Sequence, residues 1–157
     1  MQRSCCKRIG HYEYFFDHSI SQAIKKDFGM ADLIIGNNVL AHVPAPGDLV
    51  AGIAALLHPE GHVVMEVPHL LTLINHIEFD TIFHQHYSYF SLDSAEVLFR
   101  KHGLYLNDVE QIPVHGGSIR LFFSWREGAS DNVIAVKKAE REGGLRQISV
   151  YRDLQEK

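Results

Sequence analysis

The chain has 157 residues, 46% hydrophobic and 22% charged, a balance that fits one globular domain able to bury a core. Its formal net charge is -4 and its 15 basic residues are scattered, which argues against a nucleic-acid or anionic-membrane surface. Eleven histidines are many for this length, so chemistry near neutral pH or metal affinity has to be considered.

The first predicted elements are a short strand and a helix. The aromatic run from His11 to Phe16 suits a strand. A helix follows, capped by Ser19 or Ser21 and closed by Gly29. Its apolar positions recur at helical spacing and are Ile20, Ala23, Ile24 and Phe28.

A strand, a helix and a second strand come next. Residues 32–38 form a continuous apolar run that ends abruptly in small polar residues, which is typical of a buried parallel strand. Residues 46–58 have an apolar helix face, residues 58–61 read as a turn, and residues 62–67 form another apolar strand. We therefore predict an α/β fold with an open, parallel sheet, in which ligands bind beyond the carboxyl ends of the strands.

Polar side chains follow these two strands. Asn37, Asn38 and His42 come just after the first strand, and Pro68 and His69 come just after the second. Because neighbouring parallel strands end at the same rim of the sheet, we expect these groups to lie close together.

Residues 79–91 concentrate titratable groups, aromatic rings and hydroxyls. His84 and His86 are two positions apart, so they would share one face of an extended segment, and the aromatic side chains beside them could exclude water. A histidine placed in this way can act as a base. A half-buried strand with structurally hydrogen-bonded histidines explains the composition equally well.

The last part of the chain contains a helix and a pair of strands. Residues 92–103 read as a helix, and residues 105–112 and 118–125 as an antiparallel pair at one edge of the sheet. We expect one domain over residues 1–127, and over residues 128–157 the start of a C-terminal domain or a tail.

The composition also bears on the cell compartment. Cys5 and Cys6 are adjacent, a spacing at which a mutual disulfide is rare, which indicates a reducing compartment. No window approaches the apolar length of a membrane span, so we expect a cytoplasmic protein without a membrane partner.

Four blocks in order resemble the S-adenosylmethionine-dependent C-methyltransferases that act on nucleotide-linked deoxysugars. The blocks are ADLIIGNNVLAHV at 31–43, LLHPEG at 56–61, FDTIFHQHYSYFS at 79–91 and HGGSIR at 115–120. The resemblance implies a class I methyltransferase fold, S-adenosylmethionine as cofactor, and a small nucleotide-sugar substrate. The implied reaction places a methyl group on the carbon next to the ketone of the sugar.

The resemblance also implies roles for single residues. His86 corresponds to the general base, and His42 to a histidine that assists it. Asn38, with Asn37 beside it, is the candidate cofactor contact, although both could be simple turn residues. Removal of the proton would give an enolate, which needs an oxyanion partner.

The substrate contacts are expected from two of the blocks. His84 and Gln85 belong to the block that holds the base, and His115 and Ser118 to the glycine-rich loop. The family usually has tyrosine and glutamate where this chain has Phe83 and Gln85. Loss of one preorganised donor can lower the rate on the order of 10² to 10³-fold, so we expect slower chemistry with the base retained.

Two alternatives remain open. No glycine-rich cofactor loop precedes Asp32, and the cysteines of the family's N-terminal zinc-binding domain are absent, so the chain could be a truncated or split fragment that needs a missing N-terminal portion. The partial sheet would then expose an apolar edge. A metal site is the other alternative, with His84, His86 and either His42 or His69 as ligands.

Overall fold

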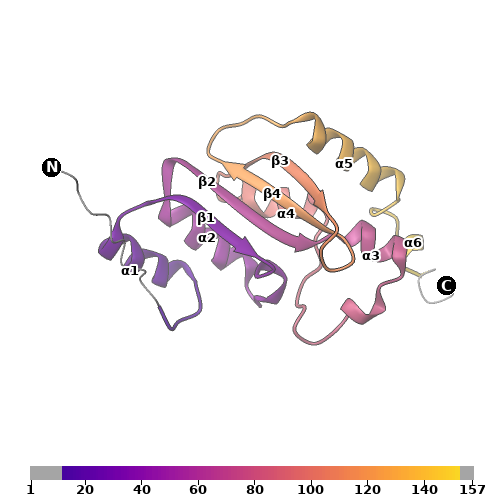
Figure 1. Cartoon of the computed structure of the whole chain (residues 1–157), viewed down its shortest axis with the longest axis horizontal. Coiled ribbons are helices and arrows are strands. Elements are labelled where there is room, and N and C mark those ends of the chain that lie inside the picture. Colours follow the sequence, from indigo (N-terminus) through magenta and orange to yellow (C-terminus); the bar gives the residue numbers. More distant parts are fainter. Residues whose placement is uncertain (1–11, 153–157) are drawn as a thin grey trace.

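The computed structural model describes residues 12–152 (Figure 1). Its elements in chain order are α1 (His18–Phe28), β1 (Ala31–Asn37), η1 (Leu40–His42), α2 (Pro46–Leu56), β2 (Leu57–Pro68), α3 (Leu70–His76), η2 (Phe79–Thr81), α4 (Leu92–Arg100), β3 (Tyr105–Ile112), β4 (Ser118–Ser124), α5 (Asp131–Glu142) and α6 (Ile148–Arg152).

The strands form one mixed sheet in the order β1-β2-β4-β3. β1 and β2 are parallel, while β4 is antiparallel to both β2 and β3. The predicted α/β fold and the antiparallel pair at one edge are therefore confirmed. The two parallel strands end at the same rim, next to the segment that carries η2 (Figure 1).

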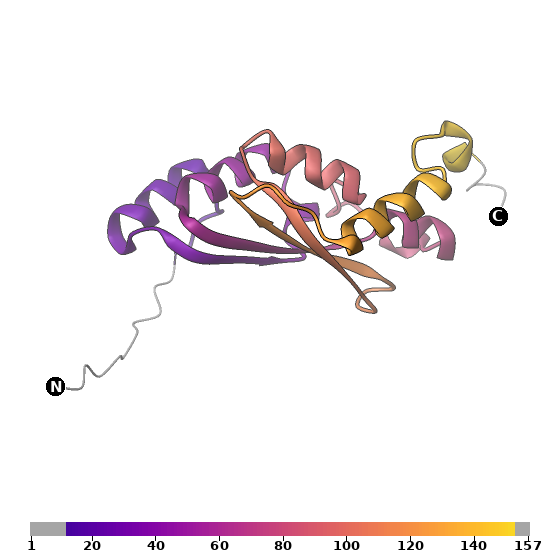
Figure 2. The ribbon, with the colours of Figure 1, turned by 90° about the horizontal axis from the view of Figure 1, so that it is seen from above.

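Helices cover one face of the sheet, as the view from above shows (Figure 2). The inward side chains of β2 and β4 alternate with outward ones and pack against the apolar stripes of α2, α4 and α5. At the centre, the rings of Phe99 on α4 and Phe123 on β4 stack with centroids 3.9 Å apart.

The other face of the sheet leaves apolar side chains of β1 in solvent. Leu33 is 53% exposed and Ile35 is 61% exposed. On this face Ile35 is in register with Val64 of β2, and Arg120 of β4 bridges Glu66 and Glu110. β1 is also an outer strand of the sheet, so the expected exposed apolar edge is present.

Three local predictions were wrong. Tyr12 to Phe16 do not form a strand, because no neighbouring strand pairs with this run; His11 lies outside the described residues. Asp17, not a serine, caps α1, since its carboxylate accepts the N–H of Ile20 at 2.8 Å. The expected turn at residues 58–61 is part of β2, which begins at Leu57.

Helix α5 packs on the same core. Val133 and Val136 are buried among the core residues, and Ser130 caps the helix by accepting the N–H of Val133. The predicted boundary between residues 127 and 128 stays a prediction, and α5 itself contacts β3 and α4.

Candidate active site

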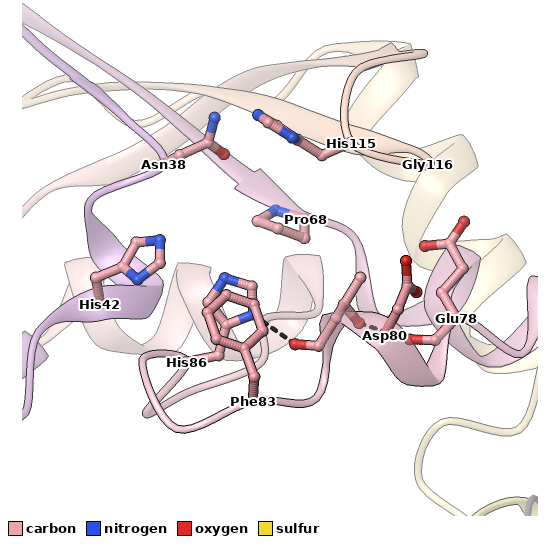
Figure 3. Close-up of a pocket in the computed structure, with 10 residues that line it drawn as sticks. Asn38, His42, Pro68, Glu78, Asp80, Phe83, His86, His115 and Gly116 are labelled. Atoms are coloured by element: carbon pink, nitrogen blue, oxygen red, sulfur yellow. Dashed lines mark hydrogen bonds between the residues drawn. The ribbon is translucent and has the colours of Figure 1, made fainter.

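A pocket of about 490 Å³ opens at the carboxyl ends of β1 and β2 (Figure 3). It is lined by Asn38, His42, Pro68, Glu78, Asp80, Thr81, Phe83, His86, His115 and Gly116. The expected delivery of polar groups to this rim holds for Asn38 and His42, which follow β1. It was wrong for the end of β2, from which only the apolar ring of Pro68 lines the pocket, because His69 is buried against Glu140. The pocket is large enough for a small organic molecule.

Asn38 follows β1 in the left-handed region, with φ 53°. This conformation is one that asparagine tolerates better than most residues. Its N–H donates to the main-chain oxygen of Glu66 at 2.8 Å, which fixes the residue against the end of β2. Its side-chain Oδ1 is buried and has no hydrogen-bond partner among the described residues. An acceptor of this kind is suited to a donor group on a bound ligand.

Three imidazoles line the pocket, and the ring centroids of two of them, His42 and His86, lie 4.7 Å apart. His86 Nδ1 is 2.7 Å from the main-chain oxygen of Thr81, and His42 Nδ1 is 3.0 Å from that of Gln85. A carbonyl oxygen only accepts, so each Nδ1 carries the proton. In the neutral ring, Nε2 then has a free lone pair, which is the form that a general base requires.

The segment that carries His86 is a turn, which differs from the extended segment predicted. The N–H of His86 donates to the oxygen of Phe83 at 3.0 Å, and His84 and Gln85 occupy the turn between them. The ring of Phe83 lies 4.3 Å from that of His86, centroid to centroid, and Tyr89 meets His86 edge to face at 6.0 Å. The turn therefore sends His84 and His86 in different directions.

The glycine-rich loop between β3 and β4 closes another side of the pocket. His115 has φ 51° and Gly117 has φ 139°, both outside the range that most side chains prefer. The N–H of His69 donates to the oxygen of Gly117 at 3.0 Å, which ties the loop to the end of β2. A Cβ on Gly117 would overlap the side chain of Thr72.

Four of the predicted site residues do not line this pocket. Asn37 lines a separate cavity beside the outer edge of β1. His84 and Gln85 are exposed in the turn, and the Gln85 main chain serves to hold His42. Ser118 is buried, and its hydroxyl donates to the oxygen of Val114. Their assignment to cofactor or substrate stays a prediction.

Sequence reasoning missed the two carboxylates of the pocket, Glu78 and Asp80. Both belong to the connection between α3 and the turn of His86. Glu78 directly precedes the 79–91 block and Asp80 lies within it, which was the available signal, but acidic residues in a predicted loop are ordinarily solvated surface groups. Only the fold of the connection places the Glu78 carboxylate against the loop of His115 and brings Asp80 to the pocket.

A buried polar pair behind the pocket was also missed. His69 and Glu140 are 1% and 2% exposed, and His69 Nε2 lies 2.9 Å from Glu140 Oε1. The same oxygen accepts the N–H of Leu92 at 2.5 Å. Because 71 residues separate the pair in sequence, no local pattern predicts it.

No group of three or more His, Cys, Asp or Glu side chains within residues 12–152 is arranged to hold a metal ion. Cys5 and Cys6 lie outside this range. Among the described helices, none combines the length and apolar character needed to cross a membrane.

Comparison with known proteins identifies the class of this domain. Residues 4–109, more than half of the chain, match the family described as "Methyltransferase domain", so the chain belongs to that family. S-adenosylmethionine is the cofactor of this class of domain. The buried, unpartnered Oδ1 of Asn38 at the end of β1 fits a contact with such a group.

Within the family, the chain is 38% identical over 143 residues to the C-methyltransferase NovU of Streptomyces niveus. The alignment covers 88% of this chain and 34% of NovU. The chain therefore spans about a third of the length of this curated relative.

Solved structures agree on the fold. A methyltransferase from Anabaena variabilis described as SAM-dependent superposes with a TM-score of 0.52 at 12% identity, over 71% of this chain and 56% of its own. A chain of the complex between the Haloferax volcanii Trm112 methyltransferase activator and a methyltransferase gives 0.51 at 14% identity, over 62% and 55%. These likenesses establish the Rossmann-like methyltransferase architecture.

Proposed function

We propose that the chain is the part of a C-methyltransferase that carries the general base, acting on the carbon next to the ketone of a nucleotide-linked deoxysugar. The similarity to a C-methyltransferase over most of the chain supports the reaction class. The observation that carries the proposal is the pair of pocket imidazoles, each with Nδ1 held by a main-chain oxygen.

His86 removes the proton in this proposal. The Thr81 carbonyl fixes the Nδ1–H form of its ring, so Nε2 can take the proton from the sugar carbon, and the electron pair moves to the ketone oxygen to give an enolate. The ring of Phe83 covers His86 and limits access of water, which strengthens electrostatic interactions in the pocket.

His42 stabilises the enolate. Since its Nδ1 proton is donated to the Gln85 carbonyl, its Nε2 can donate a hydrogen bond to the enolate oxygen only when the ring is an imidazolium. Asn38 is the residue that would hold part of the cofactor, with Asn37 next to it. When bound, S-adenosylmethionine supplies the electrophilic methyl group.

Deuterium exchange tests the base without methyl transfer. The chain would be incubated in D₂O with nucleotide-linked keto-sugars, and uptake of deuterium next to the ketone would be followed by mass spectrometry. We expect exchange by the wild-type chain and a loss of at least about 10²-fold in His86→Ala, the size typical of a general base. His18→Ala, on exposed α1, is the matched control and should exchange normally. Exchange by His86→Ala at the wild-type rate would remove His86 from the mechanism.

A second candidate is a fragment that binds no cofactor and has no activity unless a further portion of the protein joins it. The exposed Leu33 and Ile35 on β1 favour this candidate, because further segments could cover them. Calorimetric titration of the chain with S-adenosylmethionine separates the two. Binding in the micromolar range supports independent function, and no detectable heat together with no deuterium exchange supports the fragment.

A further inference from the structure

Hydrogen-bond acceptors line one wall of the pocket. The neutral ring of His86 contributes Nε2 as the base, while Asn38 and His42 serve the cofactor and the enolate oxygen in the proposed function. Glu78 and Asp80 contribute carboxylates. None of the described residues that line the pocket is a lysine or an arginine. A ligand complementary to this lining carries several hydrogen-bond donors.

The carboxylates are separated from the imidazoles along the pocket. Figure 3 shows Asn38 and His42 at one end and Glu78 and Asp80 at the other, with His86 and Pro68 between them. A sugar ring whose reacting carbon faces His86 therefore presents more distant substituents to the carboxylates. Those substituents meet acceptors with negative charge, which bind hydroxyl or ammonium groups and repel a phosphate.

The fold holds the Glu78 carboxylate in place. The hydroxyl of Thr81 donates to the main-chain oxygen of Glu78 at 2.7 Å, and the side chain of Glu78 is only 18% exposed. A Cβ on Gly116 would overlap this carboxylate, so the carboxylate packs against the loop in space that only glycine leaves open. His76 Nδ1 lies 3.4 Å from Oε1 of Glu78 on the more exposed side.

The backbone before Glu78 is strained in a way that fixes its direction. Ile77 has φ 56°, a left-handed conformation that is unfavourable for a β-branched residue. It ends α3 and turns the chain so that Glu78 and Asp80 come to the pocket.

We propose that Glu78, together with Asp80, binds a donor substituent of the sugar ring, a hydroxyl or an ammonium group, remote from the carbon that His86 deprotonates. This specificity contact rests on the proposed function, since it assumes that a sugar occupies the pocket. The same charges place the diphosphate of the substrate away from this end.

The test compares three nucleotide-linked keto-sugars that differ at one ring position, which bears hydroxyl, amino or hydrogen. Their dissociation constants are measured by calorimetry and their deuterium exchange by mass spectrometry. We expect the wild-type chain to bind the hydroxyl or amino compound about tenfold or more tightly than the hydrogen compound, as for a hydrogen bond to a charged group. Glu78→Gln should abolish most of this preference. Glu142→Gln, an exposed glutamate of α5, is the matched control.

The two sources of the donor give different results. If the bound substituent is an ammonium group, the preference for the amino compound over the hydrogen compound decreases as the salt concentration is raised. If it is a hydroxyl, the preference for the hydroxyl compound depends far less on salt. Asp80→Asn is the second variant, and because Asp80 is exposed it should fold even if Glu78→Gln does not.

The outcomes separate this inference from the proposed function. Exchange by the wild-type chain with the same preference in both variants would overturn the inference alone. If the wild-type chain shows the binding preference, Glu78→Gln loses it and the wild-type chain exchanges no deuterium, the inference is supported and the role of His86 as general base is refuted. Failure of the wild-type chain to bind any of the three compounds would overturn it as well.

Discussion

Replacement of Glu140 by alanine should strongly destabilise the domain. The carboxylate is 2% exposed and accepts three hydrogen bonds, from His69 Nε2 at 2.9 Å, from the Leu92 N–H at 2.5 Å and from the Asp93 N–H at 3.3 Å. Through them α5 is joined to the end of β2 and to the first turn of α4. Alanine would leave the His69 and Leu92 donors without their acceptor.

The magnitude follows from those donors. Each buried donor left unsatisfied costs about 1–3 kcal/mol, so two of them give about 2–6 kcal/mol. A domain of this size has roughly 8–24 kcal/mol of total stability at about 0.05–0.15 kcal/mol per residue, so the loss is a large share. Helix propensity opposes it only slightly, since alanine is the best helix former.

Urea unfolding followed by circular dichroism measures the effect. Glu142→Ala is the matched control on the same helix, because Glu142 is 69% exposed and its only partner, in the part of the chain that the structure describes, is Lys138 at 3.8 Å. The control should lose no more than about 0.5 kcal/mol. If the free energy of unfolding of Glu140→Ala lies within about 1 kcal/mol of that of Glu142→Ala, the hydrogen bonds that Glu140 accepts do not stabilise the fold.

Two further changes test the core and the helix cap. Phe123→Ala should lower the free energy of unfolding by about 3–5 kcal/mol in urea, because the ring is fully buried and stacks on Phe99; a loss below about 1 kcal/mol would contradict this packing. The Ser130 hydroxyl donates to the Asp108 carboxylate and holds its pKa below the usual value. Burial opposes this effect less strongly, and the Val109 N–H and the Asn132 amide add smaller lowering contributions. The ionised Asp108 carboxylate therefore stabilises the folded state fully above the pKa of about 4 that an aspartate has in the unfolded chain. This stabilisation is lost as the pH falls through the lower pKa that Asp108 has in the folded state. Asp108→Asn should destabilise by about 0.5 kcal/mol at pH 7 and by less at pH 2.5, and an equal difference at both pH values would refute the cause.

Much of the candidate site could be predicted because it follows from strand ends and one dense block. Asn38 and His42 come directly after a strand that its apolar run identifies, and His86 lies within the block richest in aromatic and titratable groups. The structure brings these three residues to one pocket. The direction of His84 could not be predicted, because a turn between Phe83 and His86, fixed by one main-chain hydrogen bond, breaks the alternation of an extended segment.

The sequence by itself determined the secondary structure of the sheet and the chemistry that the strand ends bring to the rim. Periodicity is a local property, so the apolar run of β1, the apolar face of α2 and the antiparallel pair could be recognised from neighbouring residues alone. Only the tertiary structure decided what the outer surfaces and the pocket walls are. Glu140 contacts His69, although 71 residues separate them in the sequence. Glu78 packs against the loop at Gly116. Leu33 is exposed to solvent because, in the described part of the chain, helices cover one face of the sheet only (Figure 2). Such contacts depend on which surfaces the folded chain brings together, and no short-range pattern encodes them.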